Sequence, residues 1–165
     1  MERTRLGRYA AVLVFIAFGV TSCIRTDARL TQTCRTSLCC PDCQRVSVSR
    51  VIDGDTFVIP GGHVRLFGVD APEQGERCSA EATHRLEELA NSAVRVERGP
   101  RVTDSNERLL YYVYTAVGDS IDEMLVREGL ARAWRRDGQH RTVLVELEGK
   151  ARRDGRGCLW RVGTG

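Results

Sequence analysis

The stretch that decides the fold spans residues 51–73 and reads VIDGDTFVIPGGHVRLFGVDAPE. Its Asp-Gly step stands among alternating apolar residues, which is the strongest short-range signal for a β-hairpin. Thr56–Ile59 is therefore predicted to form one strand and residues 63–69 the returning strand, with a Pro-Gly-Gly turn between them. Because side chains alternate along a strand, Arg65 is expected to leave the apolar face of the hairpin.

Acidic residues gather in the same stretch. Asp55 stands where the hairpin starts and Asp70 where its second strand ends, so the two carboxylates can meet. Together with a nearby backbone carbonyl, they form the kind of oxygen site that binds calcium at about 2.3–2.6 Å. The alternative is a solvated turn, of which an Asp-Gly-Asp step on its own is also typical.

Length and composition indicate one ordinary globular domain. The 165 residues are enough for a single core, and 42% hydrophobic with 28% charged residues is usual for soluble proteins. The formal net charge is +3, of which residues 1–22 contribute +2, so about +1 remains for the rest of the chain. Net charge therefore gives no argument for nucleic-acid binding.

The N-terminus is predicted to be a targeting segment. Three arginines in the first eight residues precede an apolar run over residues 10–20, which is shorter than the roughly 20 residues that span a bilayer as a helix. The run ends in Val-Thr-Ser-Cys, which resembles the bacterial lipobox. We therefore predict a lipoprotein-type signal peptide over residues 1–22 and a lipid on Cys23 that holds an exported domain at a membrane. A simple secreted form and an uncleaved anchor are the alternatives.

Four cysteines crowd the segment that follows, which we interpret as a Cys-rich tether over residues 23–44. They are Cys34, Cys39, Cys40 and Cys43. Zinc sites usually draw on two separated pairs, whereas two of these cysteines are adjacent, and an oxidising compartment favours two small disulfides. A metal site and free or intermolecular thiols stay open, as do the three possible pairings.

Periodicity along the rest of the chain predicts further strands and three helices. The strands are expected over residues 45–51, 94–98 and 109–117, and the helices over 79–93, directly after Ser120, and over 142–153. With the hairpin this makes five strands. We therefore predict an α+β fold over residues 45–162, a five-stranded OB-fold (Greek-key) β-barrel with three packed α-helices.

Three motifs carry a resemblance to a known family. They are IDGDT at 52–56, RLFGVDAPE at 65–73 and DSNER at 104–108. In content, order and spacing they resemble the staphylococcal nuclease (thermonuclease) family over about residues 45–160. That family's fold is the same OB-fold barrel, which the resemblance implies independently of the strand count.

The resemblance also implies a role for each acid and arginine of the motifs. Phosphodiester hydrolysis needs a deprotonated water, compensation of the charge on the phosphoryl oxygens, and a phosphate held still. The implied set comprises the calcium ligands Asp55, Asp70 and Ala71, the supporting Asp53, the phosphate-binding Arg65 and Arg108, and the general base Glu73.

The chain differs from the family at positions that concern substrate binding. Glu107 stands where the family commonly has glycine, and it could pair with Arg108 and draw it off the phosphate. Where the family has a Lys and a Tyr, this chain has Ser105 and Asn106. Where the family has a later pair of Tyr residues, this chain has Arg135 and Asp137. Trp134, Arg135 or Arg136 are the candidates to stack on a base instead.

Cys78 and Cys158 stand apart from the N-terminal group, one before the first helix and one after the third. The resemblance places both segments at the same end of the barrel, which implies that the two cysteines form a disulfide. The alternative is that each thiol packs as a small buried hydrophobe.

Taken with the resemblance, the motifs lead us to expect an exported, monomeric, calcium-dependent nuclease. It would hydrolyse DNA and RNA with little sequence preference and leave 3′-phosphate ends. The alternative is a non-catalytic OB-fold lipoprotein that binds nucleic acid or a protein.

Overall fold

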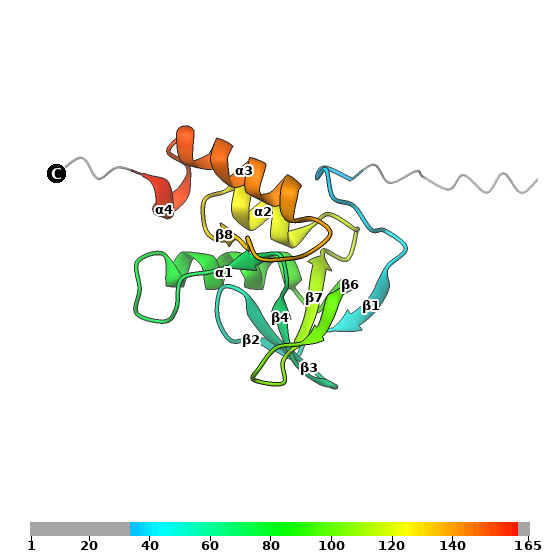
Figure 1. Ribbon diagram of the computed structural model, residues 1–165. Coiled ribbons are helices and arrows are strands. Elements are labelled where there is room, and N and C mark those ends of the chain that lie inside the picture. The colour runs from blue at the N-terminus through cyan, green and yellow to red at the C-terminus, as the bar shows by residue number, and fades with distance from the viewer. Residues whose placement is uncertain (1–33, 162–165) are drawn as a thin grey trace, which may run out of the picture. The chain divides into compact units, whose positions relative to one another are not determined.

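The computed structural model describes residues 34–161 (Figure 1). The predicted signal peptide over residues 1–22 and the lipidation site Cys23 lie outside these described residues. Among the helices of residues 34–161, none combines the length and the apolar character needed to cross a membrane.

Six strands form one sheet in the order β1-β6-β7-β4-β3-β2. Its strands are β1 (Gln44–Ser47), β2 (Arg50–Val51), β3 (Thr56–Ile59), β4 (Gly62–Leu66), β6 (Ala93–Thr103) and β7 (Leu109–Tyr114). All neighbours run antiparallel except β4 and β7, which are parallel. A separate antiparallel pair joins β5 (Val69–Asp70) to β8 (Arg132–Ala133).

The order of the strands requires the sheet to curl. β1 and β2 pair with opposite ends of the sheet, yet only Val48 and Ser49 separate them in the chain. The amide of Val48 donates to the carbonyl of Ser92 (3.0 Å), and the amide of Ser49 donates to the carbonyl of Val58 (2.8 Å). One short segment thus serves both edges, which is possible only if the sheet rolls toward a barrel. The predicted α+β OB-fold is confirmed, with the expected first strand divided into β1 and β2.

Four helices accompany the sheet: α1 (Ser79–Ala90), α2 (Ile121–Arg127), α3 (Arg141–Arg153) and α4 (Gly157–Trp160). α2 contacts α1, α3 and β7, and the three longer helices lie together beside the strands in Figure 1. Ser120 caps α2 as predicted, since its hydroxyl accepts a hydrogen bond from the amide of Glu123 at 3.1 Å. α4 was not predicted because four residues are too few to show a helical period.

The barrel and the helices share one hydrophobic core. Its largest fully buried side chains are Phe57, Leu66, Leu86, Tyr112, Tyr114, Ile121, Leu125 and Leu144. They come from β3, β4 and β7 and from α1, α2 and α3, so burial of a common apolar surface fixes the helices against the sheet. This packing gives the hairpin that carries the acids a rigid base.

The described part of the Cys-rich segment differs from the expected tether. Disulfides join Cys34 to Cys39 and Cys40 to Cys43, and Cys40 also packs against the hydrophobic core. The amide of Cys40 donates to the carbonyl of Gly118 at 2.9 Å. Residues 34–43 are thus a strap against the domain rather than a free linker.

The strap also satisfies two carboxylates of the domain. The amides of Ser37 and Leu38 donate to the two oxygens of Glu123 at 3.0 and 2.8 Å, and the amide of Arg35 donates to Asp119 at 2.6 Å. Glu123 is fully buried, and a buried charge is tolerated only with such partners. The strap is therefore an integral part of the fold.

Cys78 and Cys158 are joined by a disulfide across 80 residues, with their Cα atoms 5.6 Å apart. Cys78 immediately precedes α1 in the left-handed backbone conformation (φ 79°), and Cys158 lies in α4. The bond therefore ties the start of the first helix to the end of the domain.

Candidate active site

The β3–β4 hairpin and β5 bring Asp55, Arg65 and Asp70 together. Arg65 lies directly opposite Thr56 in the antiparallel register, which places its side chain beside Asp55. Its Nη1 forms an ion pair with Asp55 Oδ1, and its Nη2 lies 2.7 Å from Asp70 Oδ1. Asp55, in the turn before β3, and Asp70, in β5, therefore meet as the sequence led us to expect, and both contact one guanidinium group, which was not predicted.

Asp55 is the most constrained member of this group. Its Oδ2 accepts the amide of Ala71 at 2.9 Å, and its Oδ1 accepts the hydroxyl of Thr56 at 2.9 Å. Its own amide donates to Asp53 Oδ1 at 3.0 Å, so Asp53 shapes the turn behind it. Asp55 is 5% exposed, whereas the side chain of Asp70 is half exposed.

The glycine between the two aspartates is required by close packing. A Cβ on Gly54 would lie 2.6 Å from the Cβ of Ala82 on α1 and 2.8 Å from the Cβ of Ala71. Real Cβ atoms do not approach so closely, so any larger residue would push the hairpin away from α1. Gly54 thereby positions Asp55.

The charges of the group are unequal, which bears on metal binding. Burial alone would lower the pKa of Arg65, but the neighbouring Asp55 and Asp70 outweigh it and raise that pKa above its ordinary value. Two carboxylates against one guanidinium leave a negative charge, so their oxygens suit a hard cation. Within residues 34–161 there is no cluster of three or more His, Cys, Asp or Glu side chains that could hold a metal. Asp55 and Asp70, helped by backbone oxygen, are the residues that could.

Arg108 enters the same site from the loop before β7. Its Nε lies 2.7 Å from Asp104 Oδ2, and its Nη1 lies 3.4 Å from the hydroxyl of Thr56. Burial would raise the pKa of Asp104, but its hydrogen bonds with Arg108 outweigh this and lower that pKa. The carboxylate stays ionised and holds Arg108 beside the hairpin.

The sequence left open whether Glu107 pairs with Arg108 and draws it off the phosphate. Among the described ion pairs, Arg108 pairs with Asp104 and none joins it to Glu107. Glu107 has a φ of 60°, the left-handed conformation that glycine adopts most readily, which fits the glycine that the resemblance leads one to expect there.

A cleft of about 640 Å³ opens beside these arginines. Four arginines and two aromatic side chains contribute to its lining, together with two aspartates. They are Arg65, Arg101, Arg108, Arg136, Phe67, Trp134, Asp104 and Asp137. The cleft therefore combines guanidinium groups with ring faces, the two side-chain types that bind single-stranded nucleic acid.

Arg101 is the cleft residue that sequence reasoning missed. Its Nε and Nη2 donate to the two oxygens of Asp137 at 2.7 and 3.3 Å, and its guanidinium lies 5.1 Å from the centre of the Phe67 ring. No motif marked Arg101, since it lies in a part of β6 beyond the strand predicted from alternation. A basic residue at the end of a strand is usually solvated, so the sequence held no signal for it.

The three candidates for base stacking differ in whether they line the cleft. Arg136 lies 5.3 Å from the centre of the Trp134 ring, and both line the cleft. Arg135 instead pairs with the buried Glu148 at 2.8 Å and does not line the cleft. Only Trp134 and Arg136 are therefore placed to contact a bound strand.

Glu73 follows Asp70 by three residues on the loop after β5. Its amide donates to Glu76 Oε2 at 3.0 Å, its carbonyl accepts the amide of Glu76 at 2.9 Å, and its side chain is exposed. Glu73 is not among the residues that line the cleft. Chain connectivity keeps it near the acids, but no described contact joins its carboxylate to Arg65 or Arg108.

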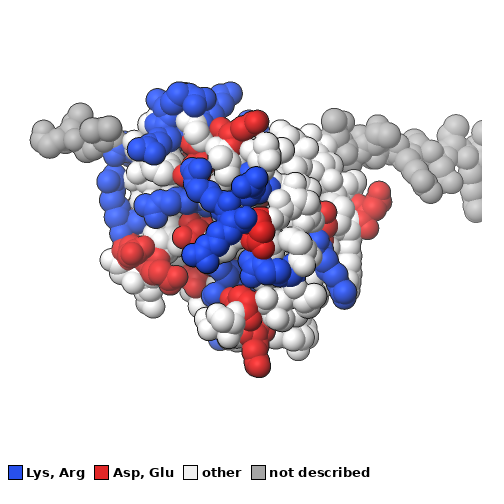
Figure 2. All heavy atoms as spheres, in the orientation of Figure 1, with Lys and Arg blue, Asp and Glu red and all other residues white. Residues whose placement is uncertain are grey.

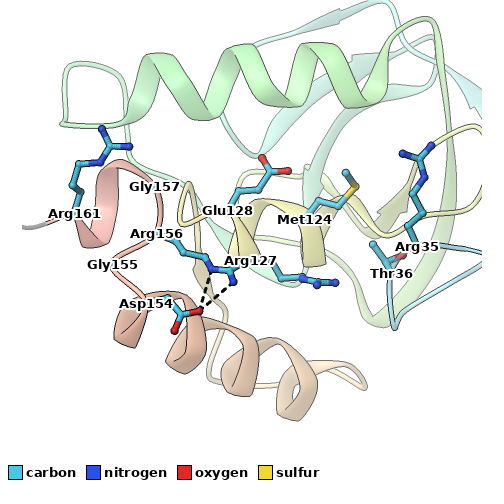
Figure 3. A pocket seen from close by; sticks show the side chains of 10 residues that line it. All are labelled: Arg35, Thr36, Met124, Arg127, Glu128, Asp154, Gly155, Arg156, Gly157 and Arg161. Atoms are coloured by element: carbon cyan, nitrogen blue, oxygen red, sulfur yellow. Dashed lines mark hydrogen bonds and ion pairs between the residues drawn. The ribbon is translucent and has the colours of Figure 1, made fainter.

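A second cavity, of about 650 Å³, contains none of the predicted site residues (Figure 3). It lies between the strap, α2 and the segment around α4. Arg156 pairs there with Asp154 at 3.1 Å, and Arg127 pairs with Glu123 at 3.0 Å. Because this cavity contains none of the acids or arginines of the three motifs, the cleft beside Arg65 is the better candidate site.

Comparison with known proteins agrees with this geometry. The family described as "Staphylococcal nuclease homologue" matches residues 63–162, more than half of the chain. The chain belongs to the staphylococcal nuclease family. The matched residues include the returning strand with Arg65, the acids at 70 and 73, and Arg108, so the family assignment covers most of the candidate site.

Three relatives in the staphylococcal nuclease family illustrate the extent of the similarity. Endonuclease YncB of Bacillus subtilis (strain 168) is 41% identical over 100 residues, which cover 53% of this chain and 46% of that protein. The thermonuclease of Staphylococcus intermedius is 38% identical over 98 residues, 52% of this chain and 57% of that protein. The micrococcal nuclease of Shigella flexneri is 32% identical over 129 residues, 70% of this chain and 73% of that protein. The chain thus spans about half the length of the first two.

Proposed function

We propose that this protein is a calcium-dependent nuclease that hydrolyses phosphodiester bonds in DNA and RNA and leaves 3′-phosphate ends. The observation that carries the proposal is the convergence of buried Asp55 and half-exposed Asp70 on Arg65, at a cleft that Arg108 also lines. Membership of the staphylococcal nuclease family, whose relatives are named as nucleases, supports it.

The two arginines are suited to binding the scissile phosphate. A guanidinium group carries five N–H donors in a fixed plane and matches phosphate oxygens two at a time. Asp104 holds Arg108 in place and Asp55 holds Arg65, so little side-chain freedom is lost when a phosphate binds. Both groups strengthen their contacts as negative charge develops on the phosphoryl oxygens.

Asp55 and Asp70, with the carbonyl of Ala71, would hold the calcium ion. Bound there, the ion would act as a Lewis acid on the phosphoryl oxygen. Two carboxylates and the one guanidinium of Arg65 leave a negative charge, which favours binding of a cation. Asp53 supports the turn at Asp55 by accepting a hydrogen bond from the Asp55 amide.

Glu73 is the proposed general base. Its exposed carboxylate is free to take a proton from water, and the hydrogen bonds between the backbone of Glu73 and Glu76 order its loop. Apo geometry does not decide such a role, because catalytic contacts often form only when substrate is bound.

Little sequence preference is expected from the cleft lining. The side chains that discriminate adenine are the amides of Asn and Gln, and none lines the cleft. The contacts on offer are mainly guanidinium groups, which can bind the phosphate of any nucleotide.

We further propose that the enzyme is an exported monomer anchored by a lipid on Cys23. The three disulfides within residues 34–161 support an oxidising compartment. Recovery of the mature protein with acylated Cys23 at its N-terminus tests this; a soluble form starting at another residue would contradict it.

The function is tested by incubating single-stranded DNA and RNA with the protein, in calcium or in excess chelator. We expect cleavage of both strands in calcium, products ending in 3′-phosphate, and no cleavage in chelator. Tight binding without cleavage would instead favour the non-catalytic OB-fold binding protein.

A further inference from the structure

The cleft continues beyond the pair of arginines assigned to the scissile phosphate. Arg101 and Arg136 also line it, and no carboxylate lies within ion-pair distance of Arg136 among the described residues. Among the described residues, four arginines and two acids, Asp104 and Asp137, line the cleft, so the lining has a formal charge of +2.

Asp137 organises this second part of the cleft. It accepts both Nε and Nη2 of Arg101, and its Oδ1 also accepts the indole N–H of Trp134 at 2.7 Å. The bidentate contact occupies two of the five N–H donors of Arg101 and leaves three for another ligand. Arg101 is thus held in a fixed orientation with donors to spare.

The cleft lining suits a strand of nucleic acid. The guanidinium of Arg101 lies over the ring of Phe67, which follows Arg65 by two residues. Arg65, Phe67 and Arg101 all line the cleft. A strand whose phosphate meets Arg65 can therefore extend along the cleft to Arg101.

The ring faces favour a phosphate over a base as the ligand here. Arg101 covers one face of Phe67 and Arg136 covers one face of Trp134. A base stacking in this part of the cleft would compete with these cation–π contacts, whereas a phosphate would use the free N–H groups and leave the contacts intact.

We propose that Arg101, positioned by Asp137 and assisted by Arg136, forms a second phosphate-binding subsite for a flanking phosphodiester of a single strand. The preferred substrates are then strands with consecutive phosphodiesters rather than mononucleotide esters. The proposal rests on the nuclease function proposed above and specifies the substrate of that same cleft.

The test measures binding of oligothymidylate in chelator, so that the strand is not cut. The wild-type protein is compared with Arg101→Gln and Arg136→Gln over a range of salt concentrations. Arg98→Gln is the matched control, because it removes the same charge three residues from Arg101 on β6, from an exposed side chain that does not line the cleft and has no ion pair among the described residues. Circular dichroism confirms that each variant is folded.

We expect Arg101→Gln to weaken binding about tenfold, the size of one lost charged contact, and Arg136→Gln to weaken it less. The slope of log K against log salt should fall by about 0.7 for Arg101→Gln, since one phosphate contact to a single strand is lost. Arg98→Gln should leave both the affinity and the salt slope close to those of the wild-type protein, because Arg98 does not line the cleft.

A second arm replaces single phosphodiesters of the strand by neutral methylphosphonates. Wild-type protein should lose affinity at two separate linkages, and Arg101→Gln should become insensitive at one of them. Equal losses of affinity for Arg101→Gln and Arg98→Gln, or the same methylphosphonate pattern for Arg101→Gln as for wild type, would overturn the subsite. Failure of the nuclease function would show separately, as absence of cleavage by wild-type protein in calcium.

Discussion

Arg65 has two partners that compete with its proposed ligand. It neutralises Asp55 and Asp70 in the structure, and it is also the residue proposed to bind the scissile phosphate. Asp55 and Asp70 would be the partners of a bound cation, which would free the guanidinium of Arg65 for a phosphate and so remove the competition. The arginine thereby keeps the buried carboxylate of Asp55 paired until the site is filled.

Glu73 provides the sharpest test at the scale of one residue. Glu73→Gln keeps the size of the side chain but removes its capacity to accept a proton. We expect turnover to fall by roughly 10²–10⁴-fold, as is typical when a general base is lost, with little change in nucleic-acid affinity. Single-turnover cleavage together with equilibrium binding checks this. Turnover within a few-fold of wild type would assign the base to another group.

At the scale of secondary structure elements, Asp122 joins three of them. It lies in α2 and accepts the amide of Gly68, in the turn between β4 and β5, and the amide of Val113 in β7, both at 2.9 Å. The turn at Gly68 separates Arg65 from Asp70, so this fully buried carboxylate supports the strands that carry the site. Burial raises the pKa of Asp122 from 3.8 to about 6.

That shift predicts a pH dependence of stability. Between pH 3.8 and about 6 the folded chain keeps a proton that the unfolded chain releases. The stabilisation from Asp122 is therefore complete below pH 3.8 and is lost as the pH rises to about 6. Asp122→Asn removes the titration, so the unfolding free energy of wild type relative to this variant should fall by about 3 kcal/mol over that range.

Urea unfolding of both proteins at a series of pH values measures this difference. Comparing the two cancels the carboxylates whose pKa values are lowered, such as Asp104 and Asp137, which act in the opposite direction. A difference that stays constant with pH would contradict the assignment.

The disulfides differ in how much of the chain they close. Cys78–Cys158 spans 80 residues and Cys34–Cys39 spans 5. On the chain-entropy account, replacing the first pair by serine should lower the free energy of unfolding by about 4 kcal/mol and replacing the second by about 2 kcal/mol. Denaturant unfolding of the two double variants checks the order. A larger loss for Cys34→Ser/Cys39→Ser would show that the strap's hydrogen bonds to Glu123 outweigh loop closure.

At the scale of the whole molecule, charge is divided along the chain. Residues 34–126 carry ten Arg and fifteen Asp or Glu, whereas residues 127–161 carry ten Arg or Lys and five Asp or Glu. Blue side chains accordingly crowd the part of the surface in Figure 2 where α2, α3 and β8 lie in Figure 1. Because the two parts cancel in sum, attraction of nucleic acid is local to the cleft rather than a property of the net charge.

The sequence predicted contacts between residues that are close together in the chain, but not contacts between residues that are far apart. Asp55 and Asp70 are brought together by the β3–β4 hairpin and the turn that follows it, and α2 begins at its cap, Ser120. Both features arise within short stretches of chain, so alternation and helical period were sufficient to predict them. The contact of Arg101 with Asp137 joins residues 36 apart, and that of Leu38 with Glu123 joins residues 85 apart. Such contacts depend on the curl of the sheet and the docking of the strap, for which no local pattern exists.

The division of the predicted first strand into β1 and β2 also results from the curl of the sheet. Residues 45–51 alternate as one strand should, but the closing sheet needs this segment at both of its edges and bends it between Ser47 and Arg50. Alternation specifies which side chains face inward and is silent about which neighbours the strand will have.

The central claim is that Asp55 and Asp70 hold the calcium ion that phosphodiester hydrolysis requires. The most direct measurement is the initial rate of single-stranded DNA cleavage as a function of calcium concentration, for wild type and for Asp55→Ala. We expect no cleavage without calcium, and a half-saturating concentration that is much higher for Asp55→Ala, with part of the rate restored at high calcium, because a ligand rather than a proton acceptor is missing. A wild-type rate that does not depend on calcium, or the same half-saturating concentration in both proteins, would contradict the claim.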